Sequence, residues 1–126
     1  MILNENKPPR AFTVGLNNQS TIKDCGSIRL DPDEQVTLVT TDGKEYDIVR
    51  KNWGYYATPS INSRLMSFGL RAVLVKGEDG KFFLHLVEKG KEEEYTRYRT
   101  TERLAVVCWI DSHEALSRLE RKLSRD

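Results

Sequence analysis

An Asp-Gly pair between two strand-like segments is the feature that most constrains how this chain folds. Asp42-Gly43 joins residues 36–41 to residues 44–49, and the second segment alternates apolar and polar side chains. A pair of this type favours the tight turn between adjacent antiparallel strands, and the alternation is typical of a strand with one face in water. The sequence therefore predicts a β-hairpin over residues 36–49.

A second hairpin is predicted from residues 71–76 and 81–88, which flank Gly77–Gly80. Its high content of apolar residues places it at the centre of the sheet. Further strands are expected at residues 12–16 and 21–30, where Gly26 indicates a bulge or bend. The segment 104–110 is almost wholly apolar and is predicted to be an interior strand.

Three helices are predicted from capping residues and apolar periodicity. Thr58 caps the first helix, which ends at Gly69. Residues 91–103 form the second, with glutamates at its start and arginines toward its end, as the helix dipole favours. The third follows the last strand, with Asp111 and Glu114 as a capping box and a stripe of leucines facing the core.

The order of these elements predicts the fold class. Hairpins dominate, and no alternation of strands and helices with glycine-rich turns runs through the chain, so a doubly wound nucleotide fold is not favoured. We expect an α+β fold: a mostly antiparallel sheet of about six to seven strands, with about three helices packed on it. Residues 1–10 contain two prolines and are expected to be a flexible N-terminal lead-in, followed by a single domain over residues 11–126.

Charge and hydropathy restrict the partners. Twenty basic residues against nineteen acidic ones leave a net charge of +1, which provides no long-range field to attract nucleic acid or an anionic membrane. The first ten residues lack the apolar core of a signal peptide, and no apolar run reaches the roughly 18 residues that span a bilayer. We therefore expect a cytoplasmic protein without a membrane or nucleic-acid partner.

Residues that usually carry chemistry are few and scattered. Cys25 and Cys108 form no CxxC pair and are expected to be buried, reduced thiols. His85 lies in a strand and His113 in the first turn of the last helix, and the histidines and cysteines show no metal-ligand spacing. No GxSxG, Walker A, GxGxxG or HExxH motif occurs. The sequence therefore predicts no cofactor and no metal, and it favours a non-enzymatic protein.

The segment 50–60, RKNWGYYATPS, gathers cations, an amide and three aromatic rings between a strand end and a helix start. Aromatic faces beside polar groups hold sugars, bases and cations, because the rings cover apolar faces while the polar groups fix orientation. A competing interpretation is that these rings fill the core where the chain changes direction. The candidate ligand-binding residues are Arg50, Lys51, Asn52, Trp53, Tyr55, Tyr56, Thr58 and, one turn into the helix, Arg64.

Residues 24–38, DCGSIRLDPDEQVTL, and residues 45–60, EYDIVRKNWGYYATPS, resemble a small family of bacterial proteins without assigned activity. Proteins of this family are often encoded among genes for unusual surface sugars. The resemblance covers about residues 22–110. It implies sugars or nucleotide sugars as the ligand class, and it implies no catalytic residues.

Hypotheses from different classes remain open. The first is a non-enzymatic accessory or binding module that binds a sugar or nucleotide sugar through residues 50–60. The second is a small enzyme acting on such a ligand, with a histidine as acid or base and Arg50, Lys51 or Arg64 as anion clamp. This enzyme hypothesis requires one histidine to lie in the same cleft as the aromatic side chains of residues 50–60. The third is an interaction domain that forms a homodimer, or binds a protein partner, through an exposed sheet edge.

Overall fold

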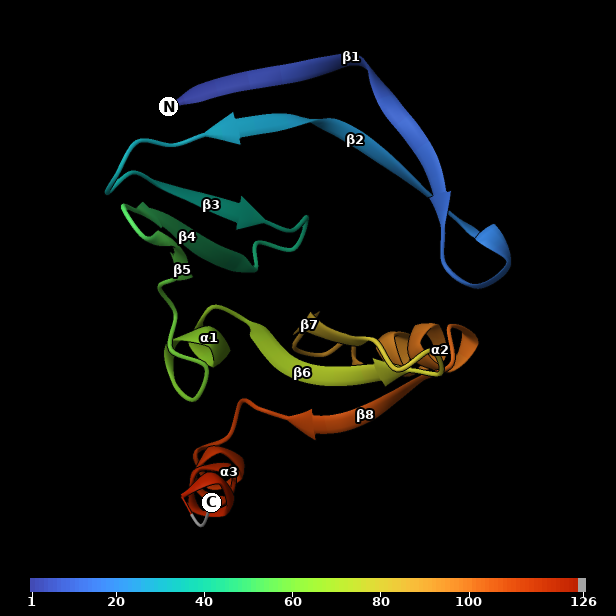
Figure 1. Cartoon of the computed structure of the whole chain (residues 1–126), viewed down its shortest axis with the longest axis vertical. Helices are drawn as coiled ribbons and strands as arrows, with labels where there is room; N and C mark the ends of the chain where they lie inside the picture. Colours follow the sequence, from blue (N-terminus) through green and yellow to red (C-terminus); the bar gives the residue numbers. More distant parts are fainter. Residues whose placement is uncertain (125–126) are drawn as a thin grey trace. The chain divides into compact units, whose positions relative to one another are not determined.

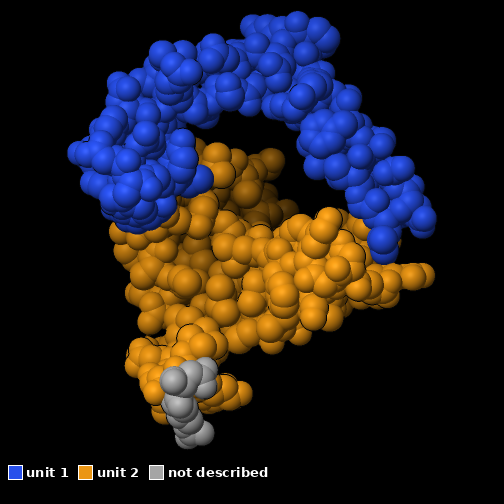
Figure 2. All heavy atoms as spheres, viewed as in Figure 1, with its two compact units in different colours: residues 1–36, 48–56 blue, residues 37–47, 57–126 orange. Residues whose placement is uncertain are grey.

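The computed structural model describes residues 1–124, and its internal contacts divide the chain into two compact units (Figure 2). Unit 1 comprises residues 1–36 and 48–56, and unit 2 comprises residues 37–47 and 57–126. Within the described residues the chain forms eight strands in three antiparallel sheets and three α-helices (Figure 1). The predicted α+β class and antiparallel pairing are confirmed, but the strands form three sheets and not one.

The sheets have the strand orders β1-β2, β3-β4-β5 and β7-β6-β8. The strands are β1 Ile2–Val14, β2 Ser20–Arg29, β3 Gln35–Val39, β4 Glu45–Lys51, β5 Gly54–Ala57, β6 Leu70–Gly77, β7 Phe82–Glu88 and β8 Leu104–Trp109. The helices are α1 Arg64–Ser67, α2 Glu92–Thr101 and α3 His113–Leu123, and a short 3-10 turn, η1 Leu16–Asn18, joins β1 to β2.

Residues 2–10, which we expected to belong to a flexible lead-in, are the first part of β1. β1 and β2 pair as a long two-stranded ribbon (Figure 1), whose register shifts between Glu5 and Arg10. Pro8 and Pro9 lie inside this shift, where their missing N–H groups break no ladder hydrogen bond. The strand depends on a partner about twenty residues away in sequence, which local composition does not reveal.

Gly26 lies opposite Glu5 at the edge of the register shift, as its predicted bulge requires. Its φ is +147°, and a Cβ at this position would lie 2.2 Å from the backbone oxygen of Asn4. Only glycine fits such an approach without moving the backbone. None of the residues of β1 and β2 is buried.

The predicted hairpin at Asp42-Gly43 is confirmed. The Thr40 N–H donates to the Lys44 oxygen at 2.9 Å, and the Gly43 N–H donates to the Thr40 oxygen at 2.9 Å. Gly43 has φ +84°, the left-handed conformation that glycine adopts without strain.

The core of unit 2 lies on both faces of β6, the middle strand of its sheet. Val73 and Val75 are fully buried on one face, and Leu70 and Ala72 are buried on the other, as alternation along a strand requires. α2 packs against β7 and β8, and α1 against β6. Around the first face lie Val87, Tyr95, Leu104 and Trp109, and around the second lie Tyr46, Leu65, Leu86 and Ile110.

The prediction of an interior strand at residues 104–110 is wrong. β8 is an edge strand, and Val106 and Val107 are exposed. β7 is the other edge, and Phe82, Phe83 and Leu84 are exposed there, so only β6 of the second hairpin is central. A three-stranded sheet has one inner strand, and the apolar content of a segment does not tell which one it is.

The first predicted helix is much shorter than expected. α1 begins at Arg64, whose N–H donates to the Ser60 hydroxyl at 3.1 Å, so Thr58 does not cap it. The end was predicted correctly, because Gly69 follows the helix with φ +86°. α3 is capped by the Ser112 hydroxyl, which accepts from the Ala115 N–H at 3.0 Å, and not by Asp111.

Candidate functional site

Residues 50–56, which contain the three aromatic side chains, belong to the β4–β5 hairpin and lie in unit 1. β4 ends at Lys51, Asn52 and Trp53 make the turn, and β5 starts at Gly54. Gly54 has φ +143°, with open space where a Cβ would be. The turn therefore needs the conformational freedom of glycine and not a close approach.

The three rings of this hairpin are open to solvent. Trp53 is 70% exposed, Tyr55 61% and Tyr56 45%. The interpretation in which these rings fill the core is therefore wrong. Large aromatic side chains gathered on a surface mark binding sites more often than isolated exposed residues do.

The side chains of the hairpin divide between its two faces. Trp53 and Tyr56 stack with ring centroids 6.2 Å apart and planes 26° apart, while the Arg50 guanidinium lies 5.8 Å from the centroid of the Tyr55 ring. Neighbouring residues of a strand point to opposite faces. Lys51 therefore shares its face with Trp53 and Tyr56, and we call these three residues the aromatic face. Arg50 and Tyr55 lie on the other side.

A turn over residues 31–34 lies against the end of β4. The Asp33 N–H donates to the Arg50 oxygen at 2.7 Å, and the Arg50 N–H donates to the Glu34 oxygen at 3.0 Å. Asp33 has φ +71°, a left-handed conformation that aspartate and asparagine tolerate better than most residues. This backbone arrangement holds the Asp33 carboxylate beside the aromatic face.

Lys51 is paired at this place. Its Nζ lies 2.5 Å from Asp33 Oδ1. The hydrogen bond to Asp33 raises the pKa of Lys51, with smaller contributions that include the nearby Tyr56 hydroxyl. Lys51 is therefore a charged donor whose charge the neighbouring carboxylate balances.

Thr58 and Arg64 belong to unit 2, and the structure does not assign them to the aromatic face. The Thr58 N–H donates to the Asp47 oxygen at 3.1 Å, and the Thr58 hydroxyl is buried without a hydrogen-bond partner among residues 1–124. The Arg64 guanidinium lies 5.2 Å from the Phe68 ring centroid. The expected helix N-terminus at residues 58–61 is absent, because α1 has four residues and starts later.

Both histidines belong to unit 2 and have neutral partners. His85 Nδ1 lies 2.7 Å from the Tyr95 hydroxyl, and burial lowers the pKa of His85. His113 Nε2 lies 3.4 Å from the Ser117 hydroxyl. No carboxylate of the described chain orients either ring, so a His–carboxylate acid–base pair is not formed there.

The cysteines differ from the expectation of buried thiols. Both are free, but Cys25 is exposed in β2 and Cys108 is half-buried in β8. Cys25 is exposed because it lies in β2, a strand of the β1–β2 ribbon that has no buried residue.

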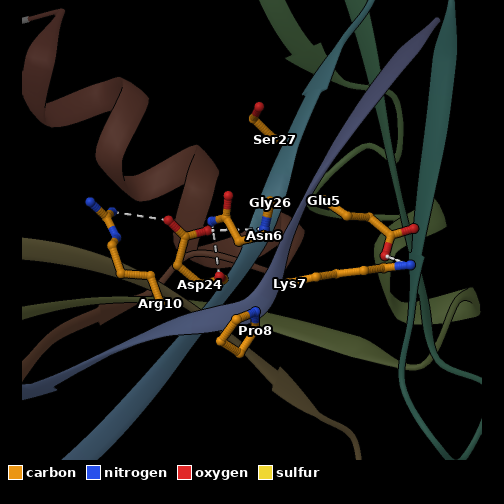
Figure 3. A pocket seen from close by; sticks show the side chains of 8 residues that line it. All are labelled: Glu5, Asn6, Lys7, Pro8, Arg10, Asp24, Gly26 and Ser27. Atoms are coloured by element: carbon orange, nitrogen blue, oxygen red, sulfur yellow. Dashed lines mark hydrogen bonds and ion pairs between the residues drawn. The ribbon is translucent and has the colours of Figure 1, made fainter.

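A hollow of about 630 Å³ opens where the ribbon changes register (Figure 3). Its charges neutralise one another: Arg10 lies 2.9 Å from Asp24, and Lys7 lies 3.2 Å from Glu5. The sequence signals for it, Gly26 in one strand and the Pro8-Pro9 pair in the other, predict a bulge and not a ligand. The lining residues are Glu5, Asn6, Lys7, Pro8, Arg10, Asp24, Gly26 and Ser27.

No group of three or more His, Cys, Asp or Glu side chains in residues 1–124 is arranged to hold a metal ion. The part of the chain that the structure describes also contains no helix of the length and apolarity that crossing a bilayer demands. No family model, curated protein or solved structure matches the chain. The geometry of the aromatic face is therefore the main guide to function.

Proposed function

We propose that this protein is a non-enzymatic binding module that holds a sugar or nucleotide sugar on the aromatic face of the β4–β5 hairpin. The observation that supports it is the exposed Trp53–Tyr56 pair, whose rings lie 6.2 Å apart. This separation is larger than the 3.5–4.0 Å contact distance between carbon atoms, so the rings are offset and do not cover each other. Together they form an aromatic surface wider than one ring.

Such a surface suits a sugar because each part of the ligand finds a matching group. The C–H face of a sugar ring is apolar and packs on an aromatic ring. Its hydroxyls need donors and acceptors beside the rings, which the Lys51–Asp33 pair provides, and Asn52 lies in the adjoining turn. Tyr and Trp lose little conformational entropy on binding, so they add contact area at low cost.

The non-enzymatic part of the proposal is supported by the content of unit 1. Unit 1 contains neither of the two histidines. Its carboxylates next to the aromatic face have partners: Asp33 pairs with Lys51, and Glu34 accepts from the Asp31 N–H at 2.8 Å. The proposal includes a role in a bacterial surface-sugar pathway, which the resemblance implies, and a cytoplasmic location, which the sequence predicts.

A screen of sugars and nucleotide sugars by thermal shift tests the proposal. A ligand at one hundred times its dissociation constant adds about 2.7 kcal/mol, a shift of several degrees. Trp53→Ala should abolish the shift at unchanged near-ultraviolet circular dichroism. Phe82→Ala is the matched control, because Phe82 is also an exposed ring but lies in β7 of unit 2. Binding that survives Trp53→Ala would refute the assignment.

Tyr55 and Tyr56 test which side of the hairpin binds. They are neighbours in β5 and both are exposed, but only Tyr56 stacks with Trp53. Tyr56→Ala should therefore weaken binding more than Tyr55→Ala in a calorimetric titration. The opposite order would place the ligand on the Arg50–Tyr55 side.

A second candidate function, self-association, is favoured by the β1–β2 ribbon. None of its residues is buried, and an isolated two-stranded ribbon is marginal in water. Its outer edges present unpaired backbone groups to a second chain. Sedimentation velocity over a range of protein concentrations tests it, and a monomer at every concentration would contradict it.

A further inference from the structure

The charges beside the aromatic face point to a narrower ligand class: we propose that the ligand is an uncharged saccharide, and that the diphosphate of a nucleotide sugar is excluded. This inference rests on the proposed function, because it concerns the ligand of the same face. The aromatic rings alone are compatible with both uncharged saccharides and nucleotide sugars, whereas the charges distinguish between these two ligand classes.

A diphosphate needs unpaired cations or a row of backbone N–H donors. The cation of the aromatic face is Lys51, and Asp33 already holds it at 2.5 Å. Arg50 is on the opposite side, over the Tyr55 ring. The described residues of unit 1 include no α-helix, so no helix N-terminus is available within that unit.

The Asp33 carboxylate of the 31–34 turn opposes an anionic ligand. The Asp33 side chain is 73% exposed, so its charge also faces an incoming ligand. The Glu34 carboxylate accepts from the Asp31 N–H at 2.8 Å and pairs with the N-terminal ammonium at 3.0 Å, so its charge is balanced. A phosphate next to Asp33 would meet a like charge and would compete with it for Lys51, and like-charge contacts disfavour wrong partners strongly.

A neutral sugar can use the same groups without breaking the ion pair. One hydroxyl donates to a free lone pair of Asp33, and its neighbour accepts from one of the two Lys51 N–H groups that Asp33 leaves unused. The Asn52 amide in the turn offers a further donor and acceptor. The ion pair thus becomes a donor–acceptor pair for adjacent hydroxyls, while the ring of the sugar packs on Trp53 or Tyr56.

Calorimetric titration of the full chain tests this inference. The neutral probes are maltose, cellobiose, lactose and N,N′-diacetylchitobiose, and the anionic probes are UDP and UDP-glucose. We expect at least one neutral disaccharide to bind about tenfold more tightly than UDP-glucose. Trp53→Ala should remove that binding.

Asp33→Asn is the decisive variant. Asparagine tolerates the left-handed backbone at this position, so the turn should persist. The change frees the charge of Lys51, so it should strengthen UDP-glucose binding about fivefold or more and weaken the neutral sugar. Asp79→Asn is the matched control, because Asp79 is an exposed carboxylate in unit 2 that pairs with Lys81 at 3.8 Å, and it should change neither affinity.

Each outcome separates the two proposals. If the wild type prefers UDP-glucose and Trp53→Ala abolishes that binding, the uncharged ligand class is wrong while the binding face stands. An unchanged preference in Asp33→Asn would also overturn the charge argument. If no probe binds, or binding ignores Trp53→Ala, the proposed function itself fails.

Discussion

Arg71→Met should destabilise unit 2, because it leaves a buried carboxylate without a partner. Arg71 Nε in β6 donates to Asp111 Oδ2 at 3.0 Å, and the guanidinium carbon lies 4.1 Å from the centroid of the Trp109 ring. The Asp111 side chain is 3% exposed, and within residues 1–124 only Arg71 donates to its carboxylate. The hydrogen bond to Asp111 also raises the pKa of Arg71, so the guanidinium stays charged at neutral pH.

The size of the effect follows from burial. Removing one partner of a buried ion pair costs about 3–5 kcal/mol. The Arg71 side chain is 27% exposed, so water partly solvates the pair, and we expect a loss of about 2–3 kcal/mol. Methionine keeps the apolar contact with the Trp109 ring but loses the cation–π attraction, which contributes about 0.5–1 kcal/mol of that loss.

Urea unfolding followed by tryptophan fluorescence measures this loss. The chain has two tryptophans, and Trp53→Phe leaves Trp109, which lies against Arg71, as the reporter of unit 2. In a thermal melt, the same loss of about 2–3 kcal/mol should lower the melting temperature by about 10 °C in a chain of this size. The double variant Arg71→Met/Asp111→Leu should recover most of the loss, because it removes both charges.

A matched control is Arg118→Met. Arg118 pairs with Glu114 at 3.6 Å on the exposed surface of α3, and such pairs contribute less than about 1 kcal/mol. An Arg71→Met variant no less stable than this control would refute the reasoning. So would a double variant that is as unstable as the single one.

Three further predictions concern packing, pH and the ribbon. Val73→Ala, at a fully buried position, should cost about 2 kcal/mol in the urea assay, whereas Val107→Ala on an exposed edge should cost less than about 0.5 kcal/mol; equal costs would contradict the core assignment. Burial lowers the pKa of His85 below its usual 6.5, so the unfolded state binds the proton first, and stability should fall as pH drops from 6.5 to the folded pKa. His85→Gln should flatten the melting temperature across that window, and an unchanged slope would count against it. Gly26→Ala should speed amide hydrogen exchange throughout β1 and β2, since its Cβ would lie 2.2 Å from the Asn4 oxygen; Gly80→Ala, with φ +86° but open space, should leave that exchange unchanged.

Several elements could be predicted because neighbouring residues determine them. Asp42-Gly43 forms its turn through the left-handed conformation of Gly43, and Gly69 ends α1 for the same reason. The charge order of residues 91–103 agrees with α2, which spans Glu92–Thr101. In each case the signal lies within a few residues of the structure that it produces.

Other features depend on contacts between distant segments. The ribbon requires residues 2–10 to pair with β2, and β8 becomes an edge because β6 takes the middle position. The Asp111 carboxylate accepts from Arg71, which is 40 residues away, and Ser112 caps α3 in its place. Local propensity contains no information about such partners.

The composition of residues 50–56 by itself determined where to look: three aromatic residues and two cations stand together in the sequence. Only the tertiary structure decided that Trp53 and Tyr56 share one face, that Arg50 lies on the other, and that Asp33 balances the charge of Lys51. The alternation of side chains along a strand divides neighbours between faces. The pairing of the 31–34 turn with β4 brings in a carboxylate 18 residues away. Sequence supplies the chemical groups of the site, whereas backbone pairing sets which of them a ligand meets together.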